Sequence, residues 1–178
     1  MNRRIFAKTL GLSIAALNFG GVPAIASKPA TQFSITMDDF NWRNAVKLTA
    51  TERNQAILDT LAANSHKAAL FVIGRNIESD EGKQLLAPWD KAGHMIANHS
   101  YSHRNFNAPE ANVEEYQQDI LRAEALLKDF PRFKKYFRFP MLKEGDTAAK
   151  RDGMRSFFAK HGYRNGYVTI DKDRKSVV

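Results

Sequence analysis

The chain has 178 residues, of which 43% are hydrophobic and 26% charged, a composition typical of one globular domain and not of a disordered chain. It contains no cysteine, which excludes disulfides and thiolate metal sites and leaves histidine and carboxylate side chains as the strong metal ligands. The formal net charge of +8 falls to +5 (24 basic and 19 acidic residues) once Arg3, Arg4 and Lys8 are set aside. Because no stripe of basic residues is interleaved with aromatic ones, we expect no nucleic-acid partner.

Residues 1–26 have the pattern of an export signal. A basic start at residues 2–8 precedes a moderately apolar run at residues 10–22, and residues 24–26 (Ala-Ile-Ala) offer small side chains for cleavage. The arrangement Arg-Arg-x-Phe-x-Lys resembles the twin-arginine signal, and an ordinary Sec signal with two chance arginines is the alternative. No later segment approaches the roughly 20 apolar residues of a membrane span. We therefore expect an exported protein, periplasmic or extracellular, with no stable membrane span.

Residues 27–32 form a short linker, and the domain that follows at residues 33–178 alternates between strand and helix patterns. Strands are predicted at residues 33–37, 68–73, 95–97, 136–139 and 166–170. A first helix is predicted to start at the capping-box pair Thr49 and Glu52, and a short second helix to lie around Leu85–Trp89, with a bend at Pro88 and a stop at Gly93. A third is predicted from Asn112 to before Pro131, and a fourth from Asp146 or Thr147 to Gly162. This alternation predicts a parallel α/β sheet or barrel with right-handed crossovers.

Polar residues follow three of these strands. Asp38 and Asp39 follow the first, His99 and His103 follow the third, and Arg138 lies at the end of the fourth. Because the residues just past the strand carboxyl ends share one face in α/β barrels, we expect these side chains to meet. One carboxylate and two imidazoles suit a divalent metal, and the second carboxylate can take a proton from water. Taken singly, the aspartates also fit a turn or a helix cap, and the histidines an exposed or internally satisfied pair.

Four segments carry a family resemblance: Ile35-Thr36-Met37-Asp38-Asp39, Ala69–Gly74, Gly93–His103 and Phe137-Arg138-Phe139-Pro140. Together they resemble the polysaccharide deacetylases (carbohydrate esterase family 4, the NodB-homology domain). The resemblance implies a distorted (β/α) barrel that removes N- or O-acetyl groups from glycans. It further implies that Asp39, His99 and His103 hold the metal. Asp38 would be the general base, and Arg138 would orient it through charge-assisted hydrogen bonds.

The expected cofactor is a divalent metal, Zn²⁺ by default for a His/carboxylate site, with Co²⁺, Ni²⁺ and Mn²⁺ as alternatives. The expected partner is an acetylated glycan, and the sequence leaves open which glycan it is and how the chain oligomerises. Two other functions remain open at this stage. The chain could be a catalytically silent glycan-binding relative, or it could hydrolyse a non-sugar amide on the same scaffold.

The chain also departs from the family pattern. Phe40 stands where the family usually has glycine. Phe40, Asn41 and Trp42 are candidates for one wall of a substrate groove, and a packing role is the alternative for all three. Pro140 is a further candidate for substrate binding. The likeness stops near Ile170, and the family's later Leu-x-x-His segment, whose histidine is the general acid, has no counterpart. His161 is a poor substitute for that acid. We therefore expect an incomplete barrel of about five βα units, and a truncated or frameshifted product is one hypothesis.

Overall fold

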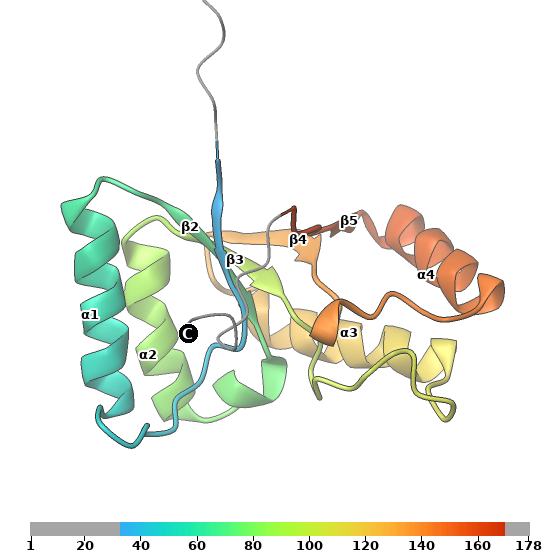
Figure 1. Cartoon of the computed structure of the whole chain (residues 1–178), viewed down its shortest axis with the longest axis horizontal. Helices are drawn as coiled ribbons and strands as arrows, with labels where there is room; N and C mark the ends of the chain where they lie inside the picture. The colour runs from blue at the N-terminus through green and yellow to red at the C-terminus, as the bar shows by residue number, and fades with distance from the viewer. Residues whose placement is uncertain (1–32, 170–178) are drawn as a thin grey trace, which may run out of the picture. The chain divides into compact units, whose positions relative to one another are not determined.

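The computed structural model describes residues 33–169, which form a sheet of parallel strands with α-helices between them (Figure 1). The strands are β1 (Ile35–Met37), β2 (Ala68–Val72), β3 (Met95–Asn98), β4 (Phe133–Phe137) and β5 (Arg164–Asn165). The helices are α1 (Ala50–Ala63), α2 (Asp80–Lys91), α3 (Val113–Leu127) and α4 (Ala148–His161), and two short 3₁₀ turns are η1 (Gly74–Ile77) and η2 (Pro140–Leu142).

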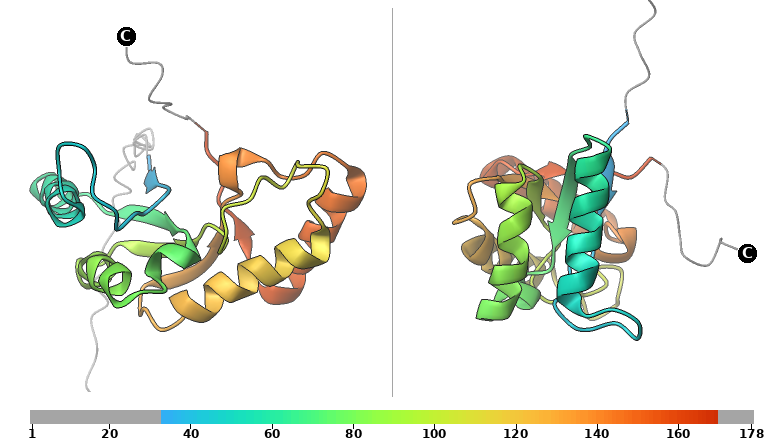
Figure 2. Two further views of the ribbon diagram at one scale, coloured as in Figure 1. Left: turned by 90° about the horizontal axis from the view of Figure 1, so that it is seen from below. Right: turned by 90° about the vertical axis from the view of Figure 1, so that its left-hand side faces the viewer.

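The strands lie side by side in chain order, β1-β2-β3-β4-β5, and every neighbouring pair is parallel. Register pairs such as Met37 with Leu70 and Val72 with Asn98 bring the carboxyl ends of the strands to one edge. The sheet curls, and the helices line its outer, convex side (Figure 2). This arrangement confirms the predicted incomplete (β/α) barrel, because each crossover returns the chain to the same end of the sheet.

Helix boundaries follow the capping residues that the sequence offers. Thr49 and Glu52 form the predicted capping box, in which the Thr49 hydroxyl accepts a hydrogen bond from the Glu52 N–H and the Glu52 carboxylate accepts one from the Thr49 N–H. Asn112 accepts hydrogen bonds from two N–H groups in the first turn of α3, and Thr147 caps α4. Gly162 then ends α4 in the left-handed conformation, with φ of 73°, which a glycine adopts without steric cost.

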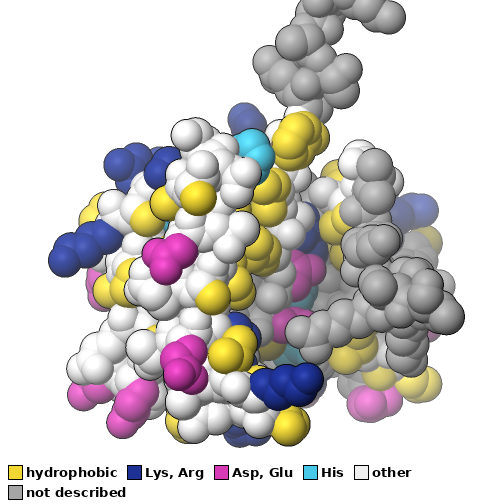
Figure 3. Space-filling view, turned by 60° about the vertical axis from the view of Figure 1, so that its left-hand side comes forward, with side chains coloured by type: hydrophobic (Ala, Val, Ile, Leu, Met, Phe, Trp, Pro, Cys, Tyr) yellow, Lys and Arg dark blue, Asp and Glu magenta, His cyan; other side chains and the backbone are white. Residues whose placement is uncertain are grey.

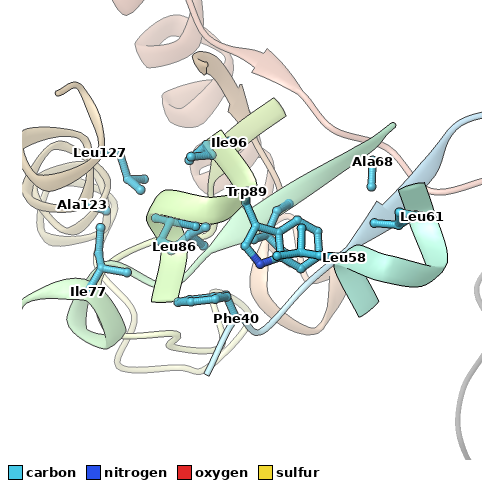
Figure 4. Close-up of a cluster of buried hydrophobic side chains, with 12 residues drawn as sticks. Phe40, Leu58, Leu61, Ala68, Ile77, Leu86, Trp89, Ile96, Ala123 and Leu127 are labelled. Carbon is cyan, nitrogen blue, oxygen red and sulfur yellow. The ribbon is translucent and has the colours of Figure 1, made fainter. Parts of the chain in front are cut away.

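Two hydrophobic clusters lie between the sheet and its helices. The first contains side chains from α1, α2, β2, β3 and α3, including Leu58, Trp89 and Ile96 (Figure 4). The second is rich in aromatic rings from β4, α3 and α4 and is centred on Phe137 and Tyr116, whose rings meet edge to face at 6.2 Å. Because these clusters fix the strands from their outer face, the strand ends are held in a defined position for the site.

Several predicted boundaries shift. Helix α2 is longer than predicted because Ser79 caps it and Pro88 is accommodated inside it. Strand β4 occupies residues 133–137 in place of the predicted 136–139, and so Arg138 lies just beyond the strand end. The prediction of a fifth strand at residues 166–170 is wrong: β5 is Arg164–Asn165. Its partner strand ends at Phe137, whose carbonyl accepts the last ladder hydrogen bond from the Gly166 N–H at 2.7 Å.

The position of Gly166 leaves no room for a side chain. A Cβ atom at this position would lie 2.5 Å from Cζ of Phe71, which is closer than any real contact. The chain therefore passes directly over the Phe71 ring where it leaves β5. This close approach holds the Gly166 carbonyl near the site described below.

His94 directly precedes β3, at the end of the strand opposite the candidate site, and its contacts are structural. Its ring is 2% exposed, packs 5.2 Å from the Trp89 ring, and accepts a hydrogen bond at Nδ1 from the Ala68 N–H. Burial, with a smaller contribution from Lys67, holds the pKa of His94 below its ordinary value. Protonation would charge a buried ring and remove the acceptor for Ala68.

We expect this histidine to make the fold less stable in mild acid. A group whose folded-state pKa is lowered contributes stability above its unfolded pKa, about 6.5 for histidine, and loses it as the pH falls below that value. The loss attributable to His94 is at most about 1.4 kcal/mol per pH unit. Denaturant unfolding at pH 7.5 and 5.5 should show a smaller pH dependence for His94→Asn than for the wild type. Equal pH dependence in the two proteins would contradict this role.

The predicted signal peptide at residues 1–26 and the linker at residues 27–32 lie outside the described residues. Within residues 33–169, no helix is long and apolar enough to cross a membrane.

Candidate metal centre

The candidate site forms where the ladder of β2, β3 and β4 continues past the strand ends. The His99 N–H donates to the Val72 carbonyl at 3.0 Å, and the Arg138 N–H donates to the Asn98 carbonyl at 3.1 Å. These bonds place the segments after β3 and β4 side by side, and the pairing of β1 with β2 brings Asp38 and Asp39 to the same edge. The structure thus brings together the five residues expected to meet there.

Three potential metal ligands converge within this group. The side chains of Asp39, His99 and His103 each offer one ligand atom, and these atoms lie within 4.8 Å of one another. Asp39 Oδ1 lies 3.0 Å from His103 Nε2 and 3.5 Å from His99 Nε2. The His99 ring is 2% exposed and the Asp39 side chain 63% exposed. The ligand set therefore opens to solvent on one side, where water or substrate could reach a bound ion. In the space-filling view, acidic and histidine side chains lie together beside hydrophobic ones (Figure 3).

The orientation of His99 fits metal binding. Its Nδ1 lies 2.8 Å from the Arg138 carbonyl oxygen, which can only accept a hydrogen bond, so the neutral ring carries its proton on Nδ1. The lone pair then belongs to Nε2, the atom that faces Asp39. Metal-binding histidines usually donate their other ring N–H in this way, which fixes the tautomer and the ring direction. A carboxylate oxygen and a ring lone pair facing each other without a proton between them are suited to holding a cation.

The charge state of Asp39 fits the same role. The interaction with the rings of His103 and then His99 holds the pKa of the Asp39 carboxyl well below its ordinary value, and it outweighs the opposing effect of burial. Asp39 is therefore ionised at neutral pH. An ionised carboxylate and two imidazoles are the donor types of mononuclear Zn²⁺ sites with three protein ligands.

The local backbone is strained at three positions. Asp39, Ser100 and His103 have positive φ values of 58°, 65° and 57°, a region that non-glycine residues occupy at a cost of roughly 1 kcal/mol or more each. The strain is held by specific bonds: Ser100 donates its N–H to Asn98 Oδ1, and its hydroxyl accepts from the His103 N–H at 2.9 Å. Such strain clusters at functional sites, where it fixes side-chain directions that relaxed backbone would not give.

Arg138 joins Asp38 to the rest of the barrel. Its guanidinium is buried and donates through Nη1 to Asp38 Oδ1 at 2.6 Å and to the Thr36 hydroxyl at 3.0 Å. Nε donates to the Gly166 carbonyl at 2.8 Å, and the group lies 4.0 Å above the Phe71 ring. These contacts hold Asp38 beside Asp39. Only Oδ1 of Asp38 takes part in the short bond to Arg138, and Oδ2 does not.

Sequence reasoning assigned no role to two further residues that hold the site. Asn98 is fully buried, and its side chain donates to the Ile120 carbonyl and the Tyr163 hydroxyl while accepting from Ser100. Asp119 on α3 accepts hydrogen bonds from two backbone N–H groups, those of Tyr101 and Ser102, at 2.9 and 3.0 Å. A sequence signal for Asp119 existed, because a carboxylate that falls on the buried stripe of a helix needs a partner.

The three predicted substrate-binding residues lie in different surroundings. Phe40 is 7% exposed and belongs to the first core cluster, in agreement with the alternative of a packing role. Pro140 is also buried and starts η2 directly after the Arg138 segment. Trp42 is 37% exposed and lines a groove between α1 and α2. The structure thus leaves Trp42 as the one of the three with an accessible side chain.

The other three histidines lie elsewhere. His94 is at the opposite strand end, His66 lies 5.8 Å from the Phe33 ring, and His161, at the end of α4, packs 4.4 Å from the Phe157 ring. Within residues 33–169 the only group of three or more His, Asp or Glu side chains with the spacing of a metal site is Asp39, His99 and His103.

Comparison with known proteins gives consistent results. The family model described as polysaccharide deacetylase matches residues 26–164. A curated peptidoglycan-N-acetylglucosamine deacetylase from Bacillus cereus is 35% identical over 71 residues, which are 40% of this chain and 24% of that protein.

Solved structures share the fold. A family 4 carbohydrate esterase from Streptomyces lividans, in complex with acetate, matches with a TM-score of 0.59 and 24% identity over 78% of this chain and 62% of its own. A CE4 family pseudoenzyme from Bacillus anthracis matches with a TM-score of 0.58 and 17% identity over 74% of this chain and 41% of its own. The chain thus spans about half the length of these solved relatives and matches a quarter of the curated one.

Proposed function

Because this chain belongs to the polysaccharide deacetylase family, we propose that it is a metal-dependent hydrolase that removes acetyl groups from a glycan. The observation that carries the proposal is the convergence of Asp39, His99 and His103 beside the Asp38–Arg138 pair. The same fold occurs in an esterase and in a pseudoenzyme, so the fold alone does not decide between activity and binding. The residues at the strand ends support activity.

Asp39, His99 and His103 would hold the metal, and the bond from His99 Nδ1 to the Arg138 carbonyl supports this by directing Nε2 toward Asp39. Zn²⁺ is the ion we propose, because two imidazoles and one carboxylate match its preferred ligands, with Co²⁺, Ni²⁺ or Mn²⁺ as alternatives. When bound, such an ion polarises an acetyl carbonyl and lowers the pKa of water toward neutrality.

Asp38 is the proposed general base. Arg138 fixes Oδ1 of its carboxylate at 2.6 Å, so the proton of the attacking water would pass to the other oxygen, Oδ2. The buried guanidinium, itself held by Thr36 and Gly166, keeps this oxygen in one position. The product of this chemistry is acetate together with a free amine or hydroxyl on the sugar.

The alternative function is glycan binding without turnover. Two observations support this alternative. One of the solved relatives is a pseudoenzyme. In addition, none of the other histidines in residues 33–169 lies at the site, where it could protonate a leaving group. A hydrolase of a non-sugar amide would use the same Asp38 chemistry and would differ in substrate.

We also propose that the chain is exported, to the periplasm or beyond, under the direction of residues 1–26. The basic start, the apolar run and the small residues before position 27 support this. Export would place the enzyme in the compartment where envelope glycans are found.

The proposed function is tested by acetate release. The purified chain should be stripped with a chelator, reloaded with Zn²⁺, and assayed on acetylated glycans, N-acetylglucosamine oligomers and acetylated xylan among them, beside small linear and cyclic amides. We expect release from a glycan that disappears on chelation and returns with the metal. Acetate release that survives complete metal removal would refute metal dependence, and activity on the amides alone would refute the substrate class.

A further inference from the structure

We propose that the groove between α1 and α2 binds sugar units of the same glycan chain at a distance from the metal centre. This inference rests on the proposed function and adds to it the place where sugar units remote from the metal centre would bind. The groove has a volume of about 660 Å³. Its walls are the first turns of α1, the length of α2, and the segment that connects β1 to α1.

An accessible tryptophan lies in this groove. Of the two tryptophans in the chain, Trp89 is 1% exposed in the core, whereas Trp42 is 37% exposed. Leaving so large an apolar ring in contact with water is unfavourable, and such rings are common where a ligand covers them. The flat C–H face of a pyranose ring is apolar while its hydroxyls point outward, so a sugar can cover the indole and still keep its polar groups hydrated or hydrogen-bonded.

Amide side chains next to Trp42 can bind those hydroxyls. Asn44 uses Oδ1 to accept from the Ala50 N–H at 2.9 Å, which leaves its NH₂ group directed away from that bond. Gln84 lines the groove from α2, and its side-chain amide makes no hydrogen bond to the described part of the chain. Amides both donate and accept, as a hydroxyl does. Arg43 and Glu81 line the groove with opposite charges, so the lining does not select a ligand of one net charge and is compatible with a neutral sugar.

The groove is continuous with the candidate catalytic residues. A second hollow, of about 870 Å³, is lined by Asp38 and Asp39, and it shares Arg43, Asn44 and Asn54 with the groove. A glycan chain could therefore extend from the acetyl group at Asp38 across this shared segment to Trp42. A single sugar could not occupy both ends.

The segment that carries Trp42 is held in place before any ligand binds. Arg53 on α1 donates to the carbonyls of Asn41 and Arg43, at 2.5 and 3.2 Å. Asn54, which also lines the groove, is held by two hydrogen bonds: its side chain donates to the Leu85 carbonyl and accepts from the Trp89 indole N–H. A preformed groove avoids the entropy of ordering a loop on binding.

The test measures the intrinsic tryptophan fluorescence of the chain, to which Trp42 contributes. In an Asp38→Asn background, which removes the proposed base and leaves Trp42 native, the metal-loaded chain is titrated with the pentamer and the monomer of N-acetylglucosamine. We expect a saturable change in tryptophan emission with the pentamer and a much weaker response to the monomer. Because Trp89 lines the neighbouring hollow and donates to Asn54, the same titration of Trp42→Phe assigns the change, which should be lost in that variant. No emission change at any pentamer concentration would overturn the proposal.

Variants measured by calorimetry make the test independent of fluorescence. Trp42→Ala should weaken pentamer binding about three- to tenfold, as expected for loss of one stacking contact, and Trp42→Phe should weaken it less. Phe33→Ala, at a 75% exposed aromatic residue outside the groove, is the matched control and should leave affinity unchanged. Equal pentamer affinity in Trp42→Ala and the control would refute the groove.

The two proposals fail in different ways. If the wild type releases acetate while Trp42 neither responds to the pentamer nor affects its affinity, the deacetylase stands and the groove is refuted. If Trp42 responds and no acetate is released from any acetylated glycan, the groove stands as a binding site and the catalytic proposal is refuted.

Discussion

Asp38→Asn should lower acetate release by about 10²- to 10⁴-fold, the range typical of a lost general base. Asparagine keeps the shape of the side chain and can still accept the Arg138 hydrogen bond through Oδ1, which is 2.6 Å long in the wild type. Its other terminal atom is a nitrogen that cannot take a proton. The measurement is the initial rate of acetate release from an acetylated glycan at saturating Zn²⁺.

The matched control for this variant is metal content. Asp38 is outside the ligand set, so Asp38→Asn should retain the wild-type metal stoichiometry, whereas its melting temperature should fall because the buried Arg138 guanidinium loses its charge partner. A rate close to the wild type would show that another group takes the proton. Loss of metal together with activity would show that Asp38 acts as a ligand, and the roles of the two adjacent aspartates would then have to be exchanged.

The second large effect is expected for the proposed metal ligands. His99→Ala and Asp39→Ala should each abolish tight binding of a divalent ion, because two remaining protein ligands are too few for a mononuclear site. The measurement is metal per chain by elemental analysis after dialysis. The wild type should hold close to one ion, and acetate release should fall in parallel with its loss.

His161→Ala provides the control for these substitutions. It makes the same change to a histidine that packs on Phe157 at the end of α4 and offers nothing to the ligand set. We expect full metal content in this variant. Retention of one ion in both His99→Ala and Asp39→Ala would mean that the metal lies elsewhere, and the proposed site would be rejected.

Much of the fold could be read from local signals in the sequence. The Thr49–Glu52 capping box, the Asn112 cap and the Gly162 stop each act within a few residues, so the chain itself specifies them. The alternation of strands and helices then placed the polar residues at one edge of a parallel sheet. For this reason the clustering of Asp39 with His99 and His103 could be predicted.

Other features depend on contacts that no local pattern reveals. Strand β5 ends at Asn165 because its partner ends at Phe137 and because Gly166 must pass over the Phe71 ring. Among the described residues, Tyr167 and Val168 fit a strand pattern but have no partner in the ladder. The position of Asp119 on the buried stripe of α3 signals that it needs a partner, but its partners are backbone N–H groups, which exist at every residue and so do not reveal which segment it holds. The accessibility of Trp42 depends on how α1 and α2 pack.

The bond from Arg138 to Asp38 has a consequence for the order of folding. It joins residues 100 positions apart, and the bond from Arg138 to Thr36 spans 102 positions. Contacts at such separation form late, because the entropy of closing a long loop is recovered only when the intervening elements have assembled. Asp39, the proposed metal ligand after β1, therefore meets His99 and His103 only in a nearly native chain. Loss of the site should be an early sign of partial unfolding, ahead of any loss of helix content.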